Sequence, residues 1–209
     1  MMVSALIERE ISAAEFPVRH GVFVAIVGPS GAGKDTVIAY ARDRLAGNEG
    51  VEFVRRVITR PSDAASEDHD TLADAAFEEA EHAGAFAVSW SAHGLRYGLP
   101  AHLDETIGSG HVAVANVSRG AIALLQARYA NVIVVEITAS ADILAQRLAA
   151  RGRESRGEVL ARLARSAELG SGVAGAIAID NSGQREEAGE RFVAVLRKAI
   201  AVSDVAGTV

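Results

Sequence analysis

Short apolar runs rich in β-branched residues alternate along this chain with stretches whose apolar residues recur at helical spacing. The segment 22–27 is apolar at every position, and 132–138 is the longest β-branched run. A strand that is buried on both faces needs apolar residues at consecutive positions, so both segments are expected inside a parallel sheet. Strands that alternate with helices predict an α/β fold, in which helices cover both faces of that sheet.

The same pattern sets bounds for the remaining elements. Further strands are predicted at 53–59, 85–90, 111–115 and 176–179. Helices are predicted at 36–45, 73–83, 119–129, 141–151, 158–169 and 186–202. Residues 61–70 are expected to form a loop, and His93-Gly94 and the segment 97–100 a turn region. With no repeat or linker along the chain, we expect one domain over residues 1–209, with an N-terminal extension at 1–20.

Composition and charge exclude several classes of function. The net charge of −6 argues against nonspecific nucleic acid binding as the main activity. The absence of cysteine excludes disulfides, zinc sites built on thiolates and cysteine nucleophiles. No apolar run approaches the ~20 residues that span a bilayer, and residues 1–20 lack the pattern of a signal peptide. The expected location is the cytoplasm, with no membrane partner.

A glycine-rich segment follows the first strand and opens the first helix. It reads Gly28-Pro29-Ser30-Gly31-Ala32-Gly33-Lys34-Asp35-Thr36 and matches a phosphate-binding loop (P-loop) for ATP. Glycines allow the backbone to curl so that its N–H groups point at phosphate oxygens, and the helix N-terminus adds a partial positive charge. Lys34, one of two lysines beside nineteen arginines, is expected to reach the β- and γ-phosphates. A turn without a ligand is the alternative, which the position between strand and helix disfavours.

The residue after Lys34 departs from the usual loop, in which a serine or threonine hydroxyl binds Mg²⁺. Asp35 stands there, and its carboxylate is a hard oxygen ligand that can bind Mg²⁺ directly or through a water. Many P-loop enzymes carry an acid at the end of a later strand, whereas here Asn116 follows the strand at 111–115. We therefore interpret Asp35 as the metal residue. The alternative is that Asp35 only favours the helix N-terminus and that Thr36 or water serves the metal.

From about residue 23 to its C-terminus the chain resembles the guanylate kinase superfamily. The resemblance rests on the loop and on Thr59-Arg60, Ser89-Trp90, His93-Gly94, Tyr97-Gly98, Arg147-Leu148 and Arg162-Leu163. Within it, the segments 33–36, 57–60, 89–98, 116–119 and 151–154 are similar to the ribose 1,5-bisphosphate phosphokinase family. That family phosphorylates ribose 1,5-bisphosphate to 5-phosphoribosyl 1-diphosphate (PRPP), in phosphonate catabolism and as a route to NAD. The resemblance implies a kinase that uses ATP and Mg²⁺.

Differences from guanylate kinases concern the acceptor. Those enzymes read guanine with two acids, where this chain has Ser89 and Val117. Buried guanine donors without acceptors would cost ~1–3 kcal/mol each. The resemblance implies an acceptor-binding insert at 59–100, with Arg60, Tyr97 and Arg119 as substrate-binding residues. Guanidinium groups match phosphate oxygens bidentately, so the two arginines suit an acceptor with two phosphates. Arg96 is interpreted either as a further phosphate ligand or as an ordinary surface arginine.

Arginines are concentrated between residues 147 and 165, which hold six of the nineteen. The resemblance implies a lid at 151–157 that closes over the transferring phosphoryl group. Because negative charge spreads over three oxygens in the transition state, Arg151, Arg153 and Arg162 are expected to be catalytic. The alternative is a solvated charged face, in which Glu158 and Arg162 form a pair worth only ~0.2–0.5 kcal/mol.

Two other functions stay open on the sequence alone. The chain could be a guanylate or other nucleoside monophosphate kinase, or a non-catalytic interaction domain of the guanylate kinase type. The retained glycines and Lys34 argue against the second. The expected partner is a small-molecule substrate, and the oligomeric state is open, a homodimer included.

Overall fold

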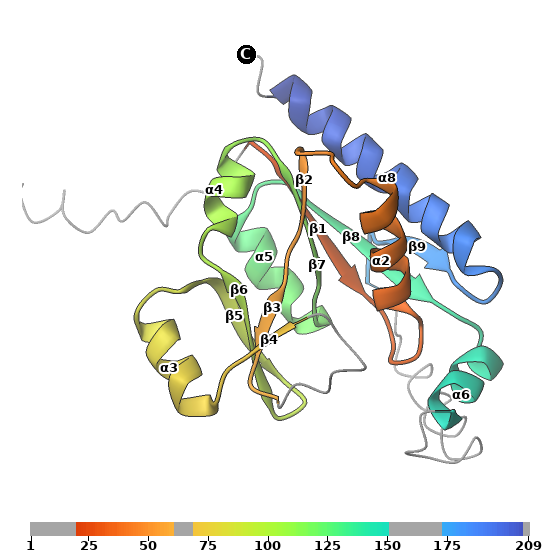
Figure 1. Ribbon diagram of the computed structural model, residues 1–209, viewed down its shortest axis with the longest axis horizontal. Coiled ribbons are helices and arrows are strands. Elements are labelled where there is room, and N and C mark those ends of the chain that lie inside the picture. The colour runs from red at the N-terminus through yellow and green to blue at the C-terminus, as the bar shows by residue number, and fades with distance from the viewer. Residues whose placement is uncertain (1–19, 61–68, 151–172, 207–209) are drawn as a thin grey trace, which may run out of the picture.

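The computed structural model describes residues 20–60, 69–150 and 173–206, which form two β-sheets and the helices around them (Figure 1). The larger sheet has the strand order β2-β7-β1-β8-β9, and all its neighbouring strands run parallel. Its strands are β1 (Val22–Val27), β2 (Val51–Phe53), β7 (Val112–Asn116), β8 (Val132–Thr138) and β9 (Ile177–Asp180). The predicted α/β fold with a parallel sheet is confirmed.

The smaller sheet has the order β4-β3-β6-β5 and is mixed, since β3 and β5 each pair antiparallel with β6. Its strands are β3 (Arg56–Ile58), β4 (His69–Thr71), β5 (Phe86–Ala92) and β6 (Leu95–Pro100). The helices are α2 (Lys34–Arg44), α3 (Asp74–His82), α4 (Leu103–Gly108), α5 (Ile122–Arg128), α6 (Ala141–Ala149) and α8 (Arg185–Ala206), with a 3₁₀ turn at Arg119–Ala121. Among these helices, none combines the length and the apolar composition that crossing a membrane requires.

Strand β1 is buried at every residue because it contributes to two hydrophobic cores. Val24 and Ile26 pack on one face with side chains of α2 and α8, among them Phe192. Phe23 and Ala25 pack on the other face with α4, α5 and the smaller sheet. The helices therefore cover both faces of the parallel sheet, as the uninterrupted apolar run predicts.

The single strand predicted at 53–59 is wrong, because the chain crosses there from one sheet to the other. Strand β2 pairs with β7, and the Val54 N–H still donates to the Val114 carbonyl at 2.9 Å. Two residues later, β3 pairs instead with β4 and β6. An extended, β-branched run predicts strand conformation, but it carries no information about which neighbour accepts its hydrogen bonds.

The turn region predicted around 93–100 is also wrong in part, because 95–100 form strand β6. Only His93 and Gly94 turn the chain, and their φ values of 53° and 75° suit a tight two-residue hairpin. Gly98 serves packing, since a Cβ there would lie 2.5 Å from the Phe86 ring. Residues 69 and 70, predicted to end the loop at 61–70, belong instead to strand β4, and the rest of that predicted loop lies outside the described residues. The helix predicted at 158–169 lies outside the described residues.

Candidate active site

The glycine-rich loop connects β1 to α2 in a conformation that needs its glycines. Gly28, Gly31 and Gly33 have φ values of 145°, 87° and 85°. A Cβ at Gly28 would lie 2.1 Å from the Ile137 carbonyl oxygen, and one at Gly33 would lie 2.4 Å from Nδ2 of Asn181. Backbone and a buried amide cannot move aside cheaply, so side chains are excluded at both positions. The loop is therefore packed closely against β8 and the end of β9.

Side chains from distant elements donate to the carbonyl oxygens of this loop. Nδ2 of Asn181 donates to the Ala32 carbonyl at 2.7 Å, and Nη1 of Arg147 lies 3.4 Å from the carbonyl oxygens of both Gly31 and Ala32. Nζ of Lys34 donates to the Gly28 and Pro29 carbonyls at 2.9 and 3.1 Å. Carbonyl oxygens repel phosphate, so donors that engage them favour an anion at the loop. The loop geometry thus suits a nucleotide phosphate chain.

Asp35 and Asn116 meet at the carboxyl edge of the parallel sheet. Asp35 lies in the first turn of α2, and Asn116 is the last residue of β7. Nδ2 of Asn116 donates to Oδ1 of Asp35 at 3.3 Å. Within the described residues, no group of three or more His, Cys, Asp or Glu side chains could hold a metal ion alone. Mg²⁺ in phosphotransferases is held by one or two carboxylates together with phosphates and waters, so this carboxylate and amide fit that ion.

Arg119 forms an ion pair with a buried acid that the sequence analysis did not single out. Nη2 of Arg119 donates to Oε1 of Glu136 at 2.6 Å. Glu136 lies on β8 in register with Val27, the residue before the phosphate-binding loop. Its side chain is only 10% exposed, whereas that of Arg119 is 43% exposed. The pair therefore fixes the Arg119 guanidinium against β8. The signal in the sequence was the single charged residue inside the β-branched run at 132–138.

Aromatic side chains of the smaller sheet face the segment that carries Arg119. The Trp90 and Tyr97 rings stack with centroids 5.3 Å apart, and Nε1 of Trp90 donates to Oγ of Ser118 at 3.0 Å. The Arg56 guanidinium lies 5.9 Å from the centroid of the Tyr97 ring. Arg60 follows β3, and its Nε and Nη2 atoms are buried. Tyr97 is thus linked through Trp90 to the segment that carries Arg119, and Arg60 follows β3, the strand that pairs with the Tyr97 strand β6.

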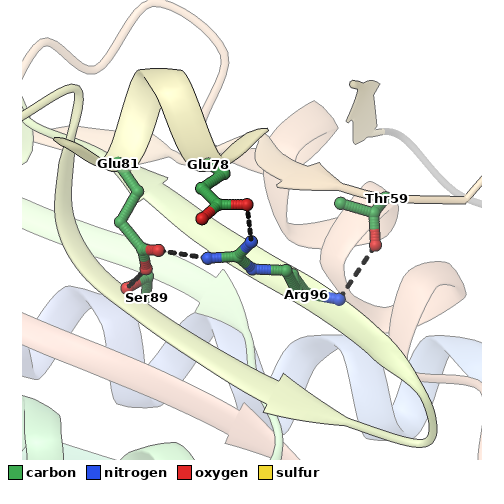
Figure 2. A network of polar contacts seen from close by, with 5 residues as sticks. All are labelled: Thr59, Glu78, Glu81, Ser89 and Arg96. Carbon is green, nitrogen blue, oxygen red and sulfur yellow. Dashed lines mark hydrogen bonds and ion pairs between the residues drawn. The ribbon is translucent and has the colours of Figure 1, made fainter. Parts of the chain in front are cut away.

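The opposite face of the smaller sheet packs on α3 through a polar network (Figure 2). Arg96 reaches from β6 to Glu81 and lies 3.9 Å from Glu78, and its backbone N–H donates to Oγ1 of Thr59 at 2.9 Å. The Ser89 hydroxyl donates to Glu81, and this bond, with the nearby Arg96, lowers the pKa of the Glu81 carboxyl below its ordinary value. The Arg96 side chain therefore links β6 to α3.

The structure describes the predicted phosphate-binding residues but not the predicted lid. The loop, Lys34, Asp35 and Thr36 lie at the carboxyl edge of the parallel sheet. Arg151, Arg153, Arg162 and the lid predicted at 151–157 lie outside the described residues. The sequence analysis did not identify the contacts of Arg147 and Asn181 with the loop, because those contacts join segments more than 100 residues apart.

Known proteins match this chain along most of its length. It is 57% identical over 205 residues to ribose 1,5-bisphosphate phosphokinase PhnN of Chelativorans sp., which covers 98% of each chain. It is 49% identical over 186 residues to the protein of the same name from Brucella melitensis, covering 89% of this chain and 96% of the relative. A guanylate kinase from Anaplasma phagocytophilum has a similar fold, with a TM-score of 0.61, 19% identity and 85% of each chain covered. No protein-family model matches.

Proposed function

Because the chain belongs to the ribose 1,5-bisphosphate phosphokinase family, we propose that it transfers the γ-phosphoryl group of ATP to the C1 phosphate of ribose 1,5-bisphosphate. The products are ADP and PRPP. The observation that carries the proposal is the intact phosphate-binding loop, with its three left-handed glycines and Lys34, in a chain with relatives of that name. Guanylate kinase similarity at 19% identity supports the fold alone.

The loop and Lys34 bind the ATP phosphates. Donors from Asn181 and Arg147 hold the Ala32 carbonyl and so keep the loop in its curled form. The Lys34 ammonium donates to the Gly28 and Pro29 carbonyls of the loop. Rotation of the flexible side chain brings the ammonium from these carbonyls to the β- and γ-phosphates. Its positive charge stabilises the charge that develops in the transition state.

Asp35 would hold Mg²⁺, directly or through a water. The ion would supply positive charge that offsets the charge of the transferring phosphoryl group. Asn116 orients the Asp35 carboxylate through its amide N–H. Many other P-loop enzymes carry a metal-binding acid at the end of the strand that corresponds to β7. In this proposal the Asp35 carboxylate takes the place of that acid.

The acceptor is held between the two sheets, in the region that Arg60, Tyr97 and Arg119 border. Arg60 binds the C1 phosphate, and Arg119 binds the second phosphate of the acceptor. A C1 phosphate oxygen forms the new bond to the γ-phosphorus as the bond from that phosphorus to the β–γ bridging oxygen breaks, and ADP leaves. A phosphate oxygen is already anionic near neutral pH, so no strong general base is required. Arg151, Arg153 and Arg162 are proposed to supply positive charge from the lid.

Identification of the product tests this function. The protein is incubated with ATP, Mg²⁺ and ribose 1,5-bisphosphate, and the mixture is followed by ³¹P NMR. We expect one ADP for each new diphosphate at C1 of the sugar. Formation of ADP without a sugar diphosphate would instead identify an ATPase and contradict the proposal.

Asp35→Asn is expected to raise the Mg²⁺ concentration needed for half-maximal rate. The substitution keeps the size and one oxygen but removes the charge, and a neutral amide is a weaker ligand for a hard cation. Excess Mg²⁺ should restore part of the rate. The measurement is a Mg²⁺ titration at saturating ATP and acceptor, with Asp43→Asn, an exposed residue near the other end of α2, as the matched control.

Superimposable Mg²⁺ curves for the wild type and Asp35→Asn would contradict the metal role. They would leave Asp35 as a charge at a helix N-terminus, worth only ~0.3–1 kcal/mol of stability. In that case the variant should show a slightly lower Tm and an unchanged metal requirement.

Glu136→Ala is expected to raise the KM for the acceptor and leave the KM for ATP unchanged. The Glu136 carboxylate holds Arg119 in place, so its loss frees the guanidinium to adopt other rotamers. A double-mutant cycle with Arg119→Ala separates this effect from a general loss of structure. The two substitutions should be strongly non-additive, with a coupling of about 0.5–3 kcal/mol in kcat/KM. Additive effects would show that Glu136 does not act through Arg119.

A further inference from the structure

Arg56 is a buried cation at the junction of the two sheets. It is the first residue of β3 and only 8% exposed. Two residues earlier, Val54 is still hydrogen bonded to β7 of the parallel sheet, and at Arg56 the chain pairs with His69 of β4. Arg56 therefore lies where the sheet that carries the phosphate-binding loop meets the sheet that carries Tyr97.

A continuous series of contacts connects Arg56 to the Arg119 segment. Its guanidinium lies 5.9 Å from the Tyr97 ring centroid, and Tyr97 stacks on Trp90. Trp90 in turn donates to the Ser118 hydroxyl, and Ser118 directly precedes Arg119. Arg56 is thus linked through one aromatic pair to Ser118, the residue before Arg119.

The neighbouring Arg55 has a different environment. Its guanidinium forms an ion pair with Asp70 at 3.0 Å, and its side chain is 53% exposed. Arg55 directly precedes β3 and meets solvent, whereas Arg56 begins β3 and is buried beside the Tyr97 ring.

The acceptor's two phosphates require two groups of cations. Arg60 follows β3 and is assigned to the C1 phosphate, whereas Arg119 is assigned to the second phosphate. Guanylate kinases read guanine with acids at two positions, which are Ser89 and Val117 in this chain. The Ser89 hydroxyl donates a hydrogen bond to Glu81 of α3, and Val117 is buried. The region that would hold a base therefore lacks these acids and is bordered by cations.

We propose that Arg56 is a specificity-determining residue that binds, with Arg119, the 5-phosphate of the acceptor. It thereby selects a sugar bisphosphate over a sugar monophosphate. This inference rests on the proposed function, because it assigns a second phosphate subsite to the same acceptor site. A planar guanidinium over an aromatic ring is held in a fixed orientation, which suits bidentate binding of phosphate oxygens.

The test compares two acceptors that differ only in the 5-phosphate. We measure kcat/KM for ribose 1,5-bisphosphate and for ribose 1-phosphate with the wild type and with Arg56→Gln. Hydrogen bonds to charged groups contribute enough to predict a roughly 10- to 100-fold loss with the bisphosphate. Activity with ribose 1-phosphate should stay within about twofold of the wild type, because that acceptor lacks the group that Arg56 binds.

Two further variants control for folding and for charge. Arg55→Gln removes an equivalent charge from the adjacent, exposed position and should alter neither acceptor. Arg56→Lys keeps the buried charge, so we expect it to fold even if Arg56→Gln does not. Thermal unfolding of both variants measures this. Arg56→Lys loses the planar fork, and we expect it to lower the bisphosphate preference by less than Arg56→Gln does.

Equal losses with both acceptors in folded Arg56→Lys or Arg56→Gln would overturn the inference, since Arg56 would then act on the reacting phosphate or on the fold. An unchanged preference in both variants would also overturn it. If the wild type converts neither ribose acceptor, the proposed function itself fails and the inference with it.

Discussion

Lys34→Ala is expected to abolish phosphoryl transfer and to leave the fold intact. The ammonium donates to the Gly28 and Pro29 carbonyls of the phosphate-binding loop, and in the proposed mechanism it supplies positive charge to the ATP phosphates. Loss of one such group from a preorganised site typically costs roughly 10²- to 10³-fold in kcat, and the effect should appear in kcat and kcat/KM together. Alanine favours the helix that begins at this residue, so the secondary structure should persist.

Lys198 offers a matched control, because it is the other lysine of the chain and is exposed on α8. Lys198→Ala removes the same charge far from the loop and should retain full activity. Rates are measured with saturating ATP and acceptor, and circular dichroism with thermal unfolding verifies the fold. Turnover of Lys34→Ala close to that of the wild type would remove the loop lysine from the mechanism.

Ribose 1,5-bisphosphate should be converted roughly 10²- to 10⁴-fold more efficiently than GMP. Guanine presents an N1–H and an amino group, and each buried donor without an acceptor costs ~1–3 kcal/mol, which converts to that range of kcat/KM for the pair. Val117 is buried and apolar, and the Ser89 hydroxyl is bonded to Glu81. The Glu81 carboxylate is also paired with Arg96, so it serves the contact between α3 and the sheet (Figure 2).

The measurement compares kcat/KM for the two acceptors in the same preparation at the same Mg²⁺ concentration. Ribose 1-phosphate, the acceptor without a 5-phosphate, provides a third point that separates rejection of the base from the need for a second phosphate. Comparable kcat/KM values for ribose 1,5-bisphosphate and GMP would sink the acceptor assignment and favour a nucleoside monophosphate kinase.

The site was partly visible in the sequence because its chemistry is partly local. The loop from Gly28 to Thr36 is contiguous, and its glycines are needed for backbone conformations that other residues rarely adopt. Asp35 was visible as a departure from the loop pattern, and its contact with Asn116 joins two segments that the sequence analysis had already compared. Arg56 was hidden, because a strand pattern does not say which of two adjacent arginines is buried.

The sequence by itself determined the α/β class and the phosphate-binding loop, because an apolar run and a glycine loop are local signals. The tertiary structure alone decided that 53–59 divides between two sheets and that 95–100 form a strand, since hydrogen-bond partners are chosen between segments. It also decided the support of the loop, in which the Asn181 amide meets the Ala32 carbonyl across 149 residues. The pairing of Arg119 with Glu136 and the burial of Arg56 have the same origin. Such contacts depend on how β8, β9 and the smaller sheet are placed around the loop, and no local pattern encodes that placement.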